Sequence, residues 1–147
     1  MQNQPPVQVS NQPPVQVNKS STGLDENVAA LLSYILNWVS GLVFFLIEKN
    51  SRLVRFHAMQ SILLFATFFV VGIVLWILSF IVGIIAGQIS SLLGTLVGLV
   101  IGLLALVYFV AFIIAWIMCM IKAYQGQYFK LPLVGKFAEQ FSMKPVS

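Results

Sequence analysis

The segment 52–61 holds the residues of this sequence with the most versatile chemistry. It runs Arg-Leu-Val-Arg-Phe-His-Ala-Met-Gln-Ser, and His57 is the only histidine of the chain. On a helix that begins near Leu53, His57 and Ser61 share a face and Gln60 lies beside them. His57 has no companion metal ligands, and no nucleophile and carboxylate stand at a recognisable spacing from it. We therefore expect an interfacial polar cluster, without catalytic or metal-binding residues, made of Arg52, Arg55, His57, Gln60 and Ser61.

The basic residues of this segment indicate contact with lipid. Lys49, Arg52 and Arg55 would each attract an anionic headgroup by about 1 kcal/mol near a membrane surface. We interpret His57 as a hydrogen-bonding or headgroup contact. Cys119 is the only cysteine, which excludes an intramolecular disulfide and a Cys-based metal cluster. We expect it to be a buried, inert thiol, with palmitoylation as the alternative.

The elements that carry these residues are expected to be membrane helices. Of the 147 residues, 59% are hydrophobic and 8% are charged, against about 45–50% and about 25% in soluble domains. No Asp, Glu, Lys, Arg or Pro interrupts residues 56–121, and about 18 apolar residues already indicate a span. This excludes a soluble enzyme, a disordered protein and a disulfide scaffold. Since HExxH, Gly-x-Ser-x-Gly and intramembrane carboxylate pairs are also missing from the sequence, we expect no enzymatic activity and no cofactor.

The fold class that follows is all-α, with three transmembrane helices over about 28–47, 57–87 and 91–121. The polar segment Gly87–Ser91 favours a turn in the long uncharged run. Three spans place seven basic residues on one side of the membrane and one, Lys19, on the other. Four spans would instead put the C-terminal lysines on the opposite side from Lys49, Arg52 and Arg55, which follow the first span. The positive-inside rule therefore favours a multi-pass protein of the cell membrane with its N-terminus outside and its C-terminus in the cytoplasm.

Small residues four apart are the strongest packing signal of the sequence. In lipid they allow helix backbones to approach closely. One stripe, Gly83 and Gly87, ends the second expected span, and the other, Gly94, Gly98 and Gly102, lies in the third. Because both flank the expected turn, we expect them to face each other in a helical hairpin. Dimerisation through the second stripe and a chance pattern are the alternatives. The residues expected to pack helices are Gly83, Gly87, Gly94, Gly98, Gly102 and Asn37.

Asn37 belongs to a polar stripe, with Ser33 and Gly41, in the first expected span. A buried amide without a partner costs about 1–3 kcal/mol in proteins, so Asn37 should face another helix. Interhelical packing is the simpler explanation of the stripe. The alternative is that Asn37 forms one wall of a polar substrate path.

The chain is expected to divide into a tail, residues 1–22, and a transmembrane domain, residues 23–147, which ends in an amphipathic tail over 122–147. Residues 1–22 contain Asn-Gln-Pro-Pro-Val-Gln-Val twice, eight residues apart, which indicates a disordered Pro/Gln-rich tail; a docking motif for a proline-binding module is the alternative. In the tail 122–147, apolar residues recur at helical spacing after Pro132. We expect a short amphipathic helix at the inner membrane surface, with a frayed tail as the alternative.

Four strings carry a resemblance to a known family. They are Asn27–Tyr34, Phe45–Lys49, Val54–Ser61 and Ala123–Pro132. The sequence resembles the uncharacterised small membrane proteins of archaea and bacteria that are related to the membrane subunit of the chloroplast inner-envelope import translocon. The resemblance covers residues 24–140, and its most specific string is Arg-Phe-His-Ala-Met-Gln-Ser. The translocon relative implies a role in a protein-conducting complex.

Two functions remain from these observations. The first is a non-enzymatic assembly or interaction partner in a membrane complex. Its partners would be the bilayer, anionic headgroups at the cytoplasmic face, and either a second copy or another membrane protein; we expect no nucleic acid. The alternative is a subunit of a protein-translocation or transport complex. The residues that would line its polar path are Asn37, His57, Gln60, Ser61 and Thr67.

Overall fold

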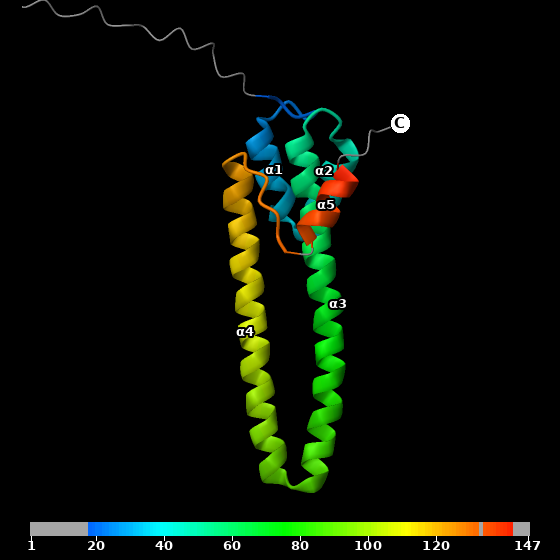
Figure 1. Cartoon of the computed structure of the whole chain (residues 1–147), viewed down its shortest axis with the longest axis vertical. Helices are drawn as coiled ribbons and strands as arrows, with labels where there is room; N and C mark the ends of the chain where they lie inside the picture. Colours follow the sequence, from blue (N-terminus) through cyan, green and yellow to red (C-terminus); the bar gives the residue numbers. More distant parts are fainter. Residues whose placement is uncertain (1–17, 133, 143–147) are drawn as a thin grey trace, which may run out of the picture.

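A computed structural model describes residues 18–132 and 134–142 of the chain. This part is all-helical. Figure 1 shows two long helices side by side, with three short helices gathered at one end of the pair. Both copies of the proline repeat lie outside the described residues. The five helices are α1 (Glu26–Ile35), α2 (Asn37–Ile47), α3 (Arg52–Ile89), α4 (Ser91–Tyr124) and α5 (Val134–Ser142).

Helices α3 and α4 are both long and apolar enough to cross a membrane. They contain 38 and 34 residues, so each is more than about 50 Å long. The break between them falls at Ser90, within the segment 87–91 that the sequence favours as a turn. Ser90 has an extended backbone, and its Oγ accepts the Leu93 amide at 3.1 Å. This bond caps a helix end that lies far from every charged residue of the described chain.

The expected single span over 28–47 is instead two short helices, α1 and α2. The chain turns at Leu36 and at Asn37, whose φ is +58°. Asparagine tolerates this left-handed backbone better than most residues. Ser40 Oγ accepts the Leu36 amide at 3.1 Å and donates to the Asn37 carbonyl at 3.2 Å. These bonds satisfy backbone groups at the turn. Three spans are therefore not confirmed: among the described residues, two helices are long and apolar enough to cross a membrane.

Helices α1 and α2 form an antiparallel hairpin against the ends of α3 and α4 (Figure 1). Its open end is closed by a bond from Ser21, before α1, to Glu48, after α2. At its tip, the Asn37 carbonyl accepts Ser61 Oγ at 3.2 Å. Ser61 lies nine residues beyond the start of α3, so the tip is about 14 Å from the polar end of the molecule. The two ends of the hairpin therefore lie together at the polar end of the molecule, and its tip lies deeper along α3.

The structure divides into a head and a stalk. The head comprises residues 18–65 and 112–142, without residue 133. The stalk comprises residues 66–111, and only Ala86 is buried there. The core lies entirely in the head, where small residues let the helices approach. Its members are Ala29, Ala30, Tyr34, Leu53, Val54, Leu64, Cys119 and Ala123.

The C-terminal helix that the sequence favours is present as α5. It packs alongside α3 in the head (Figure 1), and its buried face includes Val134 and Ala138. Phe137 and Phe141 are about half exposed. Lys130 forms an ion pair with Glu139 at 2.7 Å, which links α5 to the preceding loop. The helix is thus part of the head and also presents apolar surface outward.

Candidate functional site

Glu48 is the centre of a hydrogen-bonded cluster at the polar end of the head. Its side chain is fully buried. The backbone amides of Ser21, Asn50 and Ser51 donate to its carboxylate at 2.8–3.0 Å, and Ser21 Oγ donates at 2.9 Å. Ser51 Oγ in turn donates to Glu26 at 2.8 Å. We call Ser21, Glu26, Glu48, Asn50 and Ser51 the Glu48 clasp; it holds the N-terminal segment, the end of α2 and the start of α3 together.

The Glu48 carboxylate is stabilised in its charged form. Burial alone would raise the pKa of this carboxyl, but the amides of Ser51, Ser21 and Asn50 outweigh burial and lower it below its ordinary value. Amide donors suit the charged form because they point partial positive charge at both oxygens. The clasp therefore requires an ionised Glu48.

We expect the head to lose stability in acid for this reason. A carboxyl with a lowered folded pKa stabilises the fold above its unfolded pKa, about 4.3, and that contribution disappears as pH falls through the folded pKa. The midpoint of thermal unfolding in detergent should be level from pH 7 to about 5 and should fall below about 4. The Glu48→Gln variant should show a weaker acid dependence; an identical acid profile would contradict the assignment.

A second polar cluster, the His57 centre, lies deeper in the head. The Tyr34 hydroxyl is 3.1 Å from His57 Nδ1, and His57 Nε2 is 3.0 Å from the Gln127 carbonyl oxygen. Because a carbonyl only accepts, Nε2 carries the proton, and in the neutral ring Nδ1 accepts from Tyr34. Gln60 Nε2 donates to Cys119 Sγ at 3.3 Å. We define the His57 centre as Tyr34, His57, Gln60, Cys119 and Gln127.

The His57 centre joins four segments of the chain rather than lining an open cleft. His57, Gln60, Tyr34 and Cys119 are all fully buried. Gln60 Oε1 has no hydrogen-bond partner among the described residues, and Trp116 Nε1 donates to the Tyr34 carbonyl at 3.2 Å. A reactant would reach these groups only if the head opened. The arrangement therefore fits structural cross-linking of α1, α3, α4 and the following loop.

The five residues of the expected interfacial cluster separate in the structure. His57, Gln60 and Ser61 are buried within the head, whereas Arg52 is exposed. Arg55 lies over the Phe45 ring, with its guanidinium carbon 5.2 Å from the ring centroid. Sequence reasoning missed the roles of Tyr34 and Glu48, because Tyr34 bonds to His57 and Glu48 to Ser21, which are 23 and 27 residues away.

A polar pocket of about 470 Å³ lies beside the clasp. It combines the exposed cations Lys19 and Arg52 with the Glu26 carboxylate. Tyr128 closes one wall; burial, and then the Glu26 charge, raise the pKa of its hydroxyl, while Arg52 opposes the rise. The lining residues are Asn18, Lys19, Glu26, Asn50, Ser51, Arg52, Leu53 and Tyr128.

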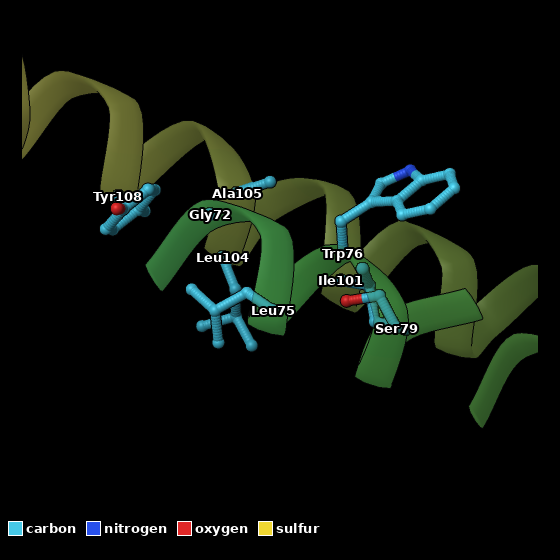
Figure 2. A pocket seen from close by; sticks show the side chains of 8 residues that line it. All are labelled: Gly72, Leu75, Trp76, Ser79, Ile101, Leu104, Ala105 and Tyr108. Atoms are coloured by element: carbon cyan, nitrogen blue, oxygen red, sulfur yellow. The ribbon is translucent and has the colours of Figure 1, made fainter. Parts of the chain in front are cut away.

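An apolar pocket of about 320 Å³ lies in the stalk between α3 and α4. Figure 2 shows Trp76 toward one end and Tyr108 toward the other. The Tyr108 hydroxyl donates to the Phe68 carbonyl at 2.9 Å. Ser79 supplies a further hydroxyl, and the remaining lining is Gly72, Leu75, Ile101, Leu104 and Ala105. This lining suits hydrocarbon chains.

The helix-packing glycines have different surroundings. A Cβ added at Gly94 would lie 3.0 Å from Gly87 Cα, so these two bring α3 and α4 together near the turn. At Gly83, Gly98 and Gly102 an added Cβ meets nothing within 4 Å. The helix-packing role of these three glycines stays a prediction. Asn37 is exposed at the hairpin turn, where its backbone carbonyl makes the contacts described above.

Comparison with known proteins places the chain among membrane proteins. A family model described as the magnetosome magnetite crystal formation protein family matches residues 24–138. A UPF0132 membrane protein of Methanocaldococcus jannaschii is 42% identical over 124 residues, which cover 84% of this chain and 94% of the relative. One from Archaeoglobus fulgidus is 41% identical over 117 residues, 80% of this chain and 95% of the relative. A second UPF0132 membrane protein of M. jannaschii is 36% identical over 119 residues, which cover 81% of this chain and 71% of the relative.

No solved structure matches the chain significantly. The relatives confirm the expected resemblance to a family of small prokaryotic membrane proteins. Neither the family description nor the names of these relatives mentions the chloroplast translocon. That part of the expectation is therefore without support.

Proposed function

The chain belongs to the magnetosome magnetite crystal formation protein family, and from this membership and the helix arrangement we propose a non-enzymatic assembly partner in a membrane complex. The family description names crystal formation. In the described residues, however, no three His, Cys, Asp or Glu side chains gather where they could hold a metal ion. The proposal therefore rests on the stalk and the head.

The exposed apolar surface of the stalk is the observation that supports this proposal. Its two helices contact each other, and large apolar side chains along both are exposed. Gly98 and Gly102 lie four residues apart on α4 in open space, where another helix backbone can approach closely. We propose that a second copy of the chain packs there.

Disulfide cross-linking tests this association. In a Cys119→Ser background, Gly98→Cys should give a covalent dimer in native membranes under mild oxidation. Ala86→Cys is the matched control, because Ala86 is the buried residue of the stalk and should cross-link much less. A particle that is strictly monomeric in mild detergent, with no dimer from Gly98→Cys, would overturn the proposal.

We also propose two spans, with both chain ends on the cytoplasmic side. The seven Lys and Arg residues of the described chain all lie in the head. With a re-entrant α1–α2 hairpin they fall on one side of the membrane, which satisfies the positive-inside rule without exception. The expectation of an external N-terminus depended on residues 28–47 crossing as one helix, and this arrangement replaces it.

Labelling of single cysteines is expected to distinguish the two topologies. In the Cys119→Ser background, Lys19→Cys and Lys130→Cys should both react with an impermeant maleimide only after the cytoplasmic side is exposed. Gln88→Cys, near the stalk turn, should react from the opposite side. Opposite sidedness of Lys19→Cys and Lys130→Cys would restore the three-span topology.

The polar pocket beside the clasp is our proposed contact for anionic headgroups. Lys19 and Arg52 supply positive charge at its rim, and each basic residue near the surface contributes about 1 kcal/mol. The Lys19→Gln/Arg52→Gln variant should therefore reduce retention of phosphatidylglycerol by about tenfold or more in detergent. The variant Lys136→Gln, which changes a charge outside the pocket, is the control. Equal loss in both variants would contradict a specific site.

The alternative role in translocation or transport has less support. Ser61, His57 and Gln60 make bonds inside the head rather than facing a channel. Thr67 is exposed, but it lies in the apolar stalk. A flux assay in liposomes that responds to His57→Ala, with the fold intact, would favour this alternative.

A further inference from the structure

We infer that this protein is a wedge for one membrane leaflet and that it prefers membranes whose head-bearing leaflet is convex. The inference starts from the unequal cross-section of the molecule. In Figure 1, α1, α2 and α5 lie beside the ends of α3 and α4, whereas only α3 and α4 continue toward the turn at Ser90. It does not require the association proposed above, only the shared two-span topology.

The depth of the head matches one leaflet. Its tip is fixed by the bond from Ser61 to Asn37 and by the bond from Trp116 to Tyr34. These contacts lie about 12–14 Å from the ends of α3 and α4 at Arg52 and Tyr124. Half of the hydrocarbon core is about 15 Å. The α1–α2 hairpin therefore stops near the bilayer midplane instead of crossing it.

The outer surface of the head is apolar, so the head belongs in lipid rather than in water. Leu36, Trp38 and Leu46 are 65%, 49% and 67% exposed. They lie on the α1–α2 hairpin with Val39, Leu42, Val43 and Ile47, which are also exposed. So many exposed large apolar side chains on one short hairpin are unusual on a water-facing domain. Phe137 and Phe141 add to this apolar surface on α5.

The charges fix the head at the membrane surface. All charged residues of the described chain lie in the head. The stalk, residues 66–111, carries no charged residue. Each of its two helices is long enough to span the rest of the bilayer. The head cannot slide to the midplane without burying these charges, which would be costly.

The consequence is a difference in occupied area between the two leaflets. A helix with its side chains is about 10 Å wide, and five helices occupy the head-bearing leaflet where two occupy the other. Amphipathic insertion into one leaflet is curvature-sensitive for the same reason. Bending the membrane toward convexity on the head side relieves this mismatch, so the protein should favour small vesicles with the head outward.

Orientation in vesicles of different size tests the wedge. The full chain, with Cys119→Ser and a fluorophore on Lys122→Cys, is reconstituted at less than one copy per vesicle into phosphatidylcholine–phosphatidylglycerol liposomes. Diameters of about 40 nm and about 400 nm are compared, because curvature dependence is strongest for the smallest vesicles. An impermeant quencher then reports the fraction of heads that face outward.

We expect the outward fraction to rise clearly as the diameter falls. The matched control carries the fluorophore on Gln88→Cys, near the other end of the molecule, and its quenched fraction should fall in parallel. The low copy number removes any effect of self-association. An outward fraction that is independent of diameter, or that falls in small vesicles, would overturn the inference even if the topology and the dimer are established.

Discussion

Replacing Glu48 by glutamine is expected to destabilise the protein by about 3 kcal/mol, because charged hydrogen bonds are lost and an amide group is turned against backbone donors. The carboxylate accepts from the amides of Ser21, Asn50 and Ser51 and from the Ser21 hydroxyl. Glutamine keeps one acceptor oxygen and places an NH₂ group where the other was. The loss should open the end of the α1–α2 hairpin and release the N-terminal segment.

The measurement is the midpoint of thermal unfolding in detergent, followed by circular dichroism. Glu139→Gln is the matched control, since it makes the same chemical change at an ion pair whose side chains are 47% and 37% exposed. An exposed pair of this kind contributes less than about 1 kcal/mol. Equal destabilisation by both variants would contradict a special role for the Glu48 clasp.

The sequence predicted the class of this protein well because membrane helices depend on local composition. The uncharged run of residues 56–121, together with the basic residues that flank it, indicated two long apolar helices, and the Gly87–Ser91 segment contains their break at Ser90. Likewise, the apolar spacing after Pro132 was sufficient for α5. In each case the signal lies within one stretch of the sequence.

The sequence could not predict the hairpin at Leu36 and Asn37. The stretch 28–47 has the length and hydropathy of a span, and neither proline nor charge marks the turn. The turn depends instead on the Ser40 side chain and on Ser61 of α3. Because the Ser61 contact lies outside this stretch, the pattern of residues 28–47 alone predicted one span and, with it, an external N-terminus.

The same limit applies to the candidate site. His57 was singled out, but its partners Tyr34 and Gln127 lie 23 and 70 residues away. For Glu48 the sequence suggested a local pair with Arg52 four residues on, whereas its carboxylate accepts from Ser21, Asn50 and Ser51. Spacing within one helix identified which residues share a face, but the partners on other segments came only from the fold.

Replacing Gly41 by valine is the second large effect that we expect, with a loss of about 3 kcal/mol from overpacking. A Cβ at Gly41 would lie 2.9 Å from the Ala58 carbonyl oxygen and 3.1 Å from the Ser61 side chain. The carbonyl belongs to the α3 backbone and cannot rotate away, so α2 must separate from α3. That movement would also break the Ser61–Asn37 bond at the hairpin tip.

Gly98→Val is the matched control, because a Cβ at Gly98 meets nothing within 4 Å. Helix propensities of glycine and valine differ by only about 0.5 kcal/mol, so the control should unfold close to the original midpoint under conditions that keep the protein monomeric. Limited proteolysis should show faster cleavage between α2 and α3 in Gly41→Val alone. If both variants unfold at the same midpoint, the close contact at Gly41 does not hold α2 against α3, and the predicted destabilisation is wrong.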